Sequence, residues 1–248
     1  MLTFFNRKNY NSKKYKLSKR LHAVSSFISL DSRIADIGTD HALLPLYLAS
    51  RGICKKIIGI EGSLKPYKRA LANVREAGFA DEIDIRLGNG LAPLEPGEVD
   101  LVAMAGLGAI NQQDILADSP EVTEKLKRIV LQPQGEVGPL RRWLAENDWC
   151  LIGEDLVFEG GHYYFILATE RGKSPKYSDI EWQLGPLLLK QRHLLLPGYV
   201  LSKMVKLTIT IGRLANSRKA EAQLRREKLI QELTMLREVF IWLRNVKK

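Results

Sequence analysis

Short apolar runs alternate along the middle of the chain with stretches whose apolar residues recur every three or four positions. A short apolar run is typical of a buried strand, and the second period is typical of a helix. Their alternation predicts a parallel sheet with helices on both faces. The predicted strands cover residues 34–37, 56–60, 83–87, 99–104 and 129–132. Helices are predicted at 41–51 and at 63–78, where Ser63 is the N-cap and Gly78 the stop.

The pattern changes after a predicted helix over residues 137–147. Residues 150–158 and 162–169 are rich in β-branched and aromatic side chains, and Glu159-Gly160-Gly161 joins them. Two such runs around a glycine-rich turn are typical of a β-hairpin. We therefore expect a Rossmann-like α/β fold whose parallel sheet ends in an antiparallel pair.

The pattern from Gly185 onward is helical. Two sets of apolar residues follow spacings of three and four on either side of a polar break at Asn216-Ser217. The first set is Leu201, Met204, Thr208, Ile211 and Ala215, and the second is Leu229, Leu233, Leu236, Phe240 and Leu243. They predict a coiled-coil-like α-helical hairpin, preceded by a break at Pro197-Gly198. The β-branched alternation over residues 207–211 would also suit a strand.

The basic residues are concentrated at the two ends of the chain. The formal net charge is +10, but residues 1–20 hold seven Lys and Arg without an acid, and residues 190–248 hold fourteen against four acids. The central segment, residues 21–189, carries a net negative charge. This segregation favours a polyanionic partner. We expect a basic extension at 1–16, a sheet domain at 17–175 that begins with a short amphipathic helix bearing Lys19, Arg20 and His22 on its outer surface, and a helical domain at 176–248.

Composition excludes several other classes of protein. No apolar run is long enough to cross a bilayer, and the amino terminus lacks the apolar core of a signal peptide. Cys54 and Cys150 fall in apolar surroundings and are interpreted as reduced core thiols. We expect a cytoplasmic protein without a metal site.

The turn after the first predicted strand is the strongest candidate for a ligand site. A buried strand with Asp36 leads into Gly38-Thr39-Asp40-His41-Ala42, and Glu61 ends the second strand. A dinucleotide fingerprint needs a second glycine where this chain has Asp40, and that carboxylate would repel a pyrophosphate. An acidic turn instead favours S-adenosyl-L-methionine, which has no phosphate and carries a sulfonium and an ammonium group. Asp36, Gly38 and Glu61 are therefore predicted cofactor ligands.

Two further corners continue the predicted cofactor site. Gly88-Asn89-Gly90 ends the third strand, where Asn89 can pair with the edge of an adenine and the glycines allow close approach. Ala105 and Gly106 follow the fourth strand, and we expect bare backbone there, without side chains between base and methyl donor.

The same motifs resemble those of the bacterial TrmK family of class I methyltransferases. They are Leu17-Ser18-Lys19-Arg20-Leu21, residues 34–42 with Leu44-Pro45, Gly88-Asn89-Gly90-Leu91, Ala105-Gly106-Leu107-Gly108, Leu131-Gln132-Pro133 and Gly185-Pro186. The resemblance implies N1-methylation of an adenine in the tRNA D-arm, at position 22. The chain departs from the family at Leu107 and Ala109, where the family has Gly-Met-Gly-Gly, and at Gln134, where the family has Asn.

Asp40 and His41 are the candidate catalytic residues. Adenine N1 carries a free lone pair, so the enzyme must mainly align it with the methyl group. Asp40 can accept from the exocyclic amine and stabilise the charge that develops on the ring, although it also suits the role of a helix cap. The partner is expected to be tRNA, and the protein a monomer or weak homodimer. Two alternatives stay open: a methyltransferase with another acceptor, and a non-catalytic RNA-binding adaptor.

Overall fold

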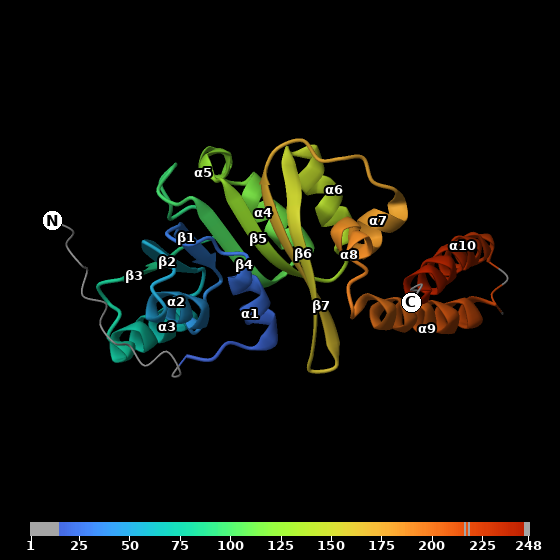
Figure 1. The fold of residues 1–248 in the computed structure, drawn as a ribbon, viewed down its shortest axis with the longest axis horizontal. Coiled ribbons are helices and arrows are strands. Elements are labelled where there is room, and N and C mark those ends of the chain that lie inside the picture. The colour runs from blue at the N-terminus through green and yellow to red at the C-terminus, as the bar shows by residue number, and fades with distance from the viewer. Residues whose placement is uncertain (1–14, 216, 218, 246–248) are drawn as a thin grey trace.

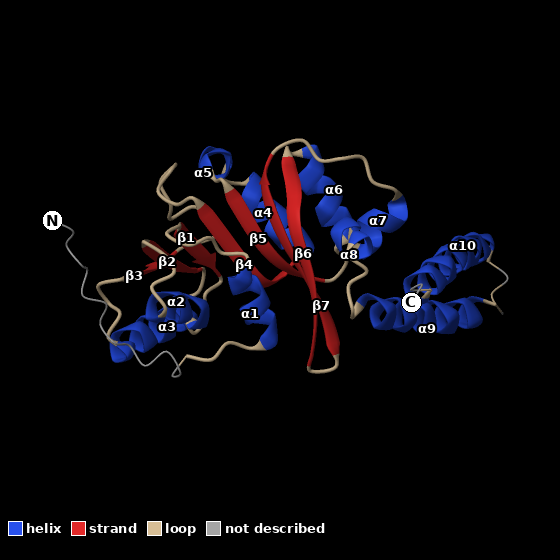
Figure 2. Cartoon of the chain, viewed as in Figure 1, coloured by secondary structure: helices blue, strands red, loops and turns tan. Residues whose placement is uncertain are grey.

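A computed structural model describes residues 15–215, 217 and 219–245, so most of the predicted basic extension lies outside the described residues. Within these residues, seven strands form one sheet in the order β3-β2-β1-β4-β5-β7-β6 (Figure 1). The strands are β1 (Arg33–Ile37), β2 (Lys56–Glu61), β3 (Ile83–Leu87), β4 (Leu101–Gly108), β5 (Arg128–Gln134), β6 (Trp149–Glu159) and β7 (His162–Arg171). Figure 2 shows helices around this central sheet.

The predicted parallel sheet with a closing hairpin is confirmed. Strands β1 to β5 run parallel, while β7 lies antiparallel to both β5 and β6. Gly160 and Gly161, both with positive φ, form the turn between β6 and β7. Pairing of β7 with β5 ends at Leu131 and Leu167. The hairpin therefore extends beyond the carboxyl end of the sheet (Figure 1).

Two apolar clusters cover the two faces of the sheet. Because alternate strand residues face opposite sides, Ile34 belongs to one cluster and Ala35 to the other. The face of Ile34 packs against α1 (Lys19–Ser26), α2 (Leu43–Ser50) and α3 (Leu64–Ala77). The face of Ala35 packs against α4 (Ala109–Ala117), α5 (Pro120–Lys125) and α6 (Gly138–Glu146).

The structure corrects two predicted element boundaries near the expected site. Helix α2 begins at Leu43 rather than at residue 41, because its N-cap Ala42 is left-handed, with φ +57°. Strand β4 continues to Gly108 through a bulge between Ala105 and Leu107. The corner expected to be a turn is therefore the irregular end of a strand.

The carboxyl-terminal segment consists of four helices: α7 (Asp179–Leu184), α8 (Pro186–Lys190), α9 (Leu196–Leu214) and α10 (Ala220–Arg244). Helices α9 and α10 pack side by side as the predicted helical hairpin (Figure 1). Pro197 and Gly198 lie in the first turn of α9, so the break precedes them. Residues 207–211 are helical, and the hydroxyls of Thr208 and Thr210 donate to carbonyls four residues earlier.

A buried ion pair joins the sheet to the first two of these helices, α7 and α8. Arg141 on α6 donates to Glu154 on β6 over 2.7 Å, and both side chains are fully buried. Arg141 also donates to the carbonyl of Trp182, and Glu154 accepts from the amide of Leu187. Gly185 passes close by, since an added Cβ would lie 2.9 Å from the Glu154 carboxylate. Helices α7 and α8 are thus fixed against α6 and β6.

Candidate functional site at the carboxyl ends of the strands

The glycine turn after β1 is held mainly by backbone hydrogen bonds to β2. The amides of Gly38 and Thr39 donate to the carbonyl of Ile60, over 2.9 and 3.2 Å. Left-handed residues alternate through the turn: Gly38 has φ +74° and Asp40 φ +47°. Gly59 makes room for the turn, because a Cβ there would lie 3.0 Å from the Thr39 side chain.

Asp36 and Glu61, two predicted cofactor ligands, lie almost fully buried beside this turn, with 5% and 8% of their surface exposed. Glu61 accepts a hydrogen bond from the amide of Asp40 through one carboxylate oxygen. Burial, together with the charge of Glu61, raises the pKa of Asp36 to about 7. Removing two neighbouring carboxylates from water costs free energy that a cationic ligand can recover.

Asp40 and His41, the predicted catalytic pair, lie together at the mouth of the site, where 59% of the Asp40 side chain is exposed. Asp40 Oδ2 lies 3.6 Å from His41 Nε2, and Arg69 Nη1 lies 3.3 Å from Asp40 Oδ1 and 3.0 Å from the same imidazole nitrogen. The side chain of Asn73 donates to the His41 carbonyl. Asp40 does not cap α2, since the N-cap is Ala42 and no side-chain cap bond is present.

The Gly88-Asn89-Gly90 corner lies next to Glu61, as the sequence predicts for one site. The amide of Gly88 donates to the Glu61 carbonyl over 2.8 Å. Asn89 is exposed, and its Oδ1 would lie 3.9 Å from a Cβ added to Gly62. Gly88 is required by packing, because a Cβ there would lie 2.3 Å from Pro93.

The corner at Ala105 and Gly106 differs from the bare backbone that the sequence predicts. The Leu107 side chain lies 3.6 Å from where a Cβ of Gly38 would be. Arg20 Nη1 would lie 3.4 Å from a Cβ of Gly106, and the same atom donates to the Gln132 side chain. Side chains from β4 and α1 therefore occupy this corner, and Arg20 points inward rather than to the outer surface.

The sequence analysis did not predict a site role for three residues of this region: Arg20, Arg69 and Gln132. Arg20 and Gln132 lie within motifs through which the chain resembles the TrmK family, so the sequence marks both positions. It does not show that the two side chains contact each other. Arg69 lies on the polar side of a regular helix, and no local pattern marks it as the partner of Asp40 and His41. Gln132 is fully buried and also donates to the carbonyl of Pro133.

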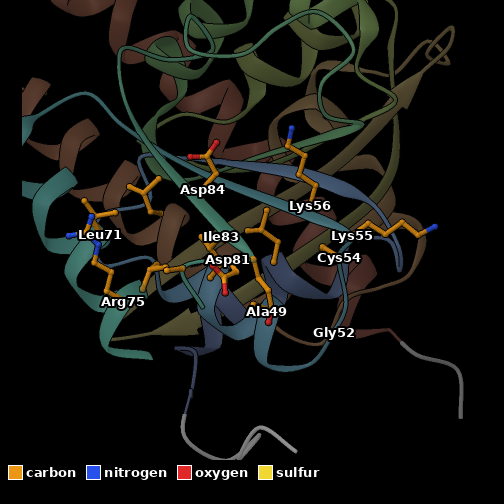
Figure 3. A pocket seen from close by; sticks show the side chains of 15 residues that line it. Ala49, Gly52, Cys54, Lys55, Lys56, Leu71, Arg75, Asp81, Ile83 and Asp84 are labelled. Atoms are coloured by element: carbon orange, nitrogen blue, oxygen red, sulfur yellow. The ribbon is translucent and has the colours of Figure 1, made fainter. Parts of the chain in front are cut away.

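Two cavities of similar size lie outside the glycine turn. The first, of about 580 Å³, lies at the amino ends of β2 and β3, at the edge of the sheet opposite the turn (Figure 3). Lys56, Arg75, Asp81 and Asp84 are among the residues that line it. The second, of about 590 Å³, lies between the β6–β7 hairpin and α9. Only the second adjoins the carboxyl ends of the strands.

The described part of the chain contains no group of three or more His, Cys, Asp and Glu residues that could hold a metal ion. Both cysteines are free and half-buried, and burial raises the pKa of the Cys54 thiol. None of the helices in the described residues is long and apolar enough to span a membrane.

The strand order, the antiparallel hairpin and the acidic corner beside the glycine turn together define a Rossmann-like methyltransferase. In agreement, the methyltransferase domain family matches residues 17–167. The tRNA (adenine(22)-N(1))-methyltransferase of Bacillus subtilis is 32% identical over 183 residues, which cover 72% of this chain and 77% of the relative.

Solved structures agree. The structure of the B. subtilis m1A22 tRNA methyltransferase TrmK has a TM-score of 0.84 and 27% identity, over 92% of this chain and all of that one. Streptococcus pneumoniae Sp1610 in complex with S-adenosyl-L-methionine has a TM-score of 0.82 and 30% identity, over 91% and 100%. The chain belongs to the tRNA (adenine(22)-N(1))-methyltransferase family.

Proposed function

We propose that the protein transfers a methyl group from S-adenosyl-L-methionine to N1 of adenine 22 in the D-arm of tRNA, giving 1-methyladenosine. The observation that carries this proposal is the acidic corner formed by the buried carboxylates of Asp36 and Glu61 beside the glycine turn. It lies on a sheet shared with relatives named for this reaction.

The residues of the corner fit the methyl donor. One oxygen of Glu61 is engaged by the Asp40 amide, and the other has no hydrogen-bond donor among the described residues, so it is available to ribose hydroxyls. Asp36 would supply a second carboxylate for the cationic groups of the donor. Gly88, Asn89 and Gly90 would hold the adenine of the donor, and Ala105 and Gly106 would lie on the side of its methyl group. The donor supplies an electrophilic methyl group on a sulfonium.

The protein's main catalytic task is alignment. Adenine N1 needs no deprotonation, and holding it in line with the methyl group can supply about 7 to 11 kcal/mol of the barrier. Asp40 accepts from the exocyclic amine and stabilises the positive charge that the ring gains. Arg69 donates to both the Asp40 carboxylate and His41 Nε2, and so holds the two side chains together at the mouth of the site. Asp40 and His41 are thus our proposed catalytic residues.

The charge distribution supports a tRNA partner and our proposed domain arrangement. The sheet domain, 17–175, carries the acidic cofactor corner, whereas the extension at 1–16 and the helical domain at 176–248 are basic. Lysines and arginines contact phosphates whatever the sequence of the RNA. The adenine lies inside folded tRNA and must be extruded before it can react. We further propose that the protein acts in the cytoplasm, as a monomer or weak homodimer.

Calorimetry with S-adenosyl-L-methionine and transfer of its labelled methyl group to bulk tRNA test the proposal. We expect saturable binding and label in the tRNA. Binding without label in the tRNA would indicate another acceptor, and absence of binding would indicate a non-catalytic adaptor. Either outcome would overturn the proposal.

A further inference from the structure

The second cavity, here called the hairpin cavity, is formed by three segments that lie far apart in the sequence. It occupies about 590 Å³, within the range of ligand pockets. The segments are residues 133–137 at the end of β5 and just after it, residues 161–165 at the start of β7, and three side chains of α9: Tyr199, Ser202 and Lys206. The cavity therefore lies where the sheet domain meets the helical hairpin.

The wall of the hairpin cavity is a group of aromatic rings that pack on one another. Tyr163 packs on Phe158 at 4.7 Å and on Tyr199 at 5.6 Å between ring centroids. Phe165 meets Tyr199 edge to face at 4.9 Å. Gly198 lets the Tyr163 hydroxyl approach, because a Cβ there would lie 2.5 Å from it. Fixed rings of this kind form a stacking surface with little left to order on binding.

The hairpin cavity adjoins the corner at which the target base meets the methyl donor. Gln134 lines the cavity, and its Nε2 would lie 4.0 Å from a Cβ added to Gly106. Tyr164, on the same hairpin, lies under the guanidinium of Arg20, which faces the same position. A nucleotide next to the target in the RNA chain is therefore within reach of the cavity.

The rim of the hairpin cavity suits a phosphate. Lys206 and His162 are exposed on it, with Glu136 as the acidic residue of the lining. By contrast, the cavity at the opposite edge is lined by aliphatic and charged residues without an aromatic ring. Aromatic walls with a cationic rim are what an unstacked nucleotide requires, since every base presents a flat π-face beside a charged backbone.

We propose that the hairpin cavity binds the base of the nucleotide immediately next to the target adenine, stacked against Tyr163 with its phosphate at Lys206. This inference rests on the proposed tRNA methyltransferase function and adds a second base-binding site to it. Holding the neighbour helps to keep the target extruded, because the two bases can no longer stack on each other.

The test is a double-mutant cycle in which one change is made in the protein and the other in the tRNA. The quantity measured is kcat/KM for methylation. Full-length protein is assayed with intact tRNA and with two tRNAs that lack the base immediately 5′ or 3′ of the target. We expect one of the abasic tRNAs to lose about tenfold in kcat/KM with the wild-type protein. With Tyr163→Leu, which removes the ring but keeps apolar volume, the same tRNA should lose less than about twofold.

Ser202→Phe provides an independent variant, because it fills the cavity without removing its wall. It should lower kcat/KM for intact tRNA and likewise abolish the effect of the missing base. Tyr177→Leu is the matched control, since Tyr177 packs on Trp182 outside the cavity and should retain the full tenfold effect. Affinity for S-adenosyl-L-methionine should be unchanged in all three variants.

The inference would be overturned if the loss from the protein variant and the loss from the missing base simply multiplied, for both abasic tRNAs and in both cavity variants. That result would show that neither missing base is the one that binds in the cavity. The proposed function would survive that result, because the wild-type protein would still methylate intact tRNA. Absence of methylation by the wild-type protein would instead contradict the proposed function itself.

Discussion

The cofactor corner and the hairpin cavity are built in opposite ways, although they meet at Gly106. In the corner, backbone amides of Gly38, Thr39 and Asp40 fix the geometry and buried carboxylates set the charge. In the cavity, aromatic side chains from β7 and α9 form the wall and an exposed lysine supplies the charge. This difference matches the two proposed roles: an acidic corner suits a cationic cofactor, and an aromatic region with a cationic rim suits nucleic acid.

The largest expected loss of stability comes from breaking the buried Arg141–Glu154 ion pair, which supports the hairpin cavity but not the cofactor corner. Arg141→Leu leaves Glu154 buried without its partner, which costs about 3 to 5 kcal/mol of stability. Arg141 also lies 5.0 Å from the Phe165 ring, so the cavity wall loses support. Thermal unfolding measures the loss, and below the midpoint the cofactor affinity should be normal.

Arg142→Leu is the matched control for this prediction. Arg142 is the neighbouring residue on α6 and pairs with the exposed Asp179, so its loss should cost less than about 1 kcal/mol. Equal destabilisation by the two variants would show that the buried pair has no special role in the fold.

Asp40→Asn should separate catalysis from cofactor binding. Asparagine tolerates the left-handed backbone at this position, so the turn should keep its shape. Loss of the charge should lower kcat by about 100-fold or more, while the Kd for the methyl donor stays within a few-fold. Asp81→Asn, on the opposite edge of the sheet, should leave both values unchanged. Equal losses in kcat and affinity would remove Asp40 from the catalytic role.

Glu61→Gln should weaken binding of the methyl donor, in contrast to Asp40→Asn, which should mainly lower kcat. Glutamine still accepts from the Asp40 amide, but it has lost the charge that binds ribose hydroxyls strongly. We expect the Kd for S-adenosyl-L-methionine to rise about 10- to 100-fold with tRNA affinity unchanged, as measured by calorimetry and by filter binding. A parallel loss of tRNA affinity would show that the corner and the RNA surface are not separate.

Cofactor affinity should also depend on pH through Asp36. Its pKa is about 7 in the free protein, and only the ionised carboxylate attracts a cation. Affinity should therefore rise roughly tenfold between pH 6 and pH 8, with proton release on binding near pH 7. Asp36→Asn should flatten the profile, and an unchanged slope in that variant would assign the titration to another group.

The sequence predicts a region well when its residues lie in one short stretch, and poorly when the region is formed by residues far apart in the chain. The cofactor corner lies in short local motifs, so its strand, glycine turn and acidic residues could be placed before the fold was known. The start of α2 could not, because the left-handed backbone of Ala42 follows from packing of the turn against β2. The same is true of Arg20, whose contact with Gln132 joins residues 112 positions apart.

The hairpin cavity shows the limit more clearly. Tyr163 and Tyr199 follow ordinary strand and helix patterns, and only the path of α9 past the hairpin brings their rings together. The alternation over residues 207–211, which would also suit a strand, lies within helix α9, because this helix packs against α10 and Thr208 and Thr210 bond to helix carbonyls four residues earlier.

The most direct test of the central claim is position-resolved mass spectrometry of tRNA treated with the protein and S-adenosyl-L-methionine. The account predicts a single methyl group, recovered as 1-methyladenosine, at position 22. A tRNA carrying guanine at that position should remain unmodified. Methylation of another base, or of the guanine-containing tRNA, would contradict the account.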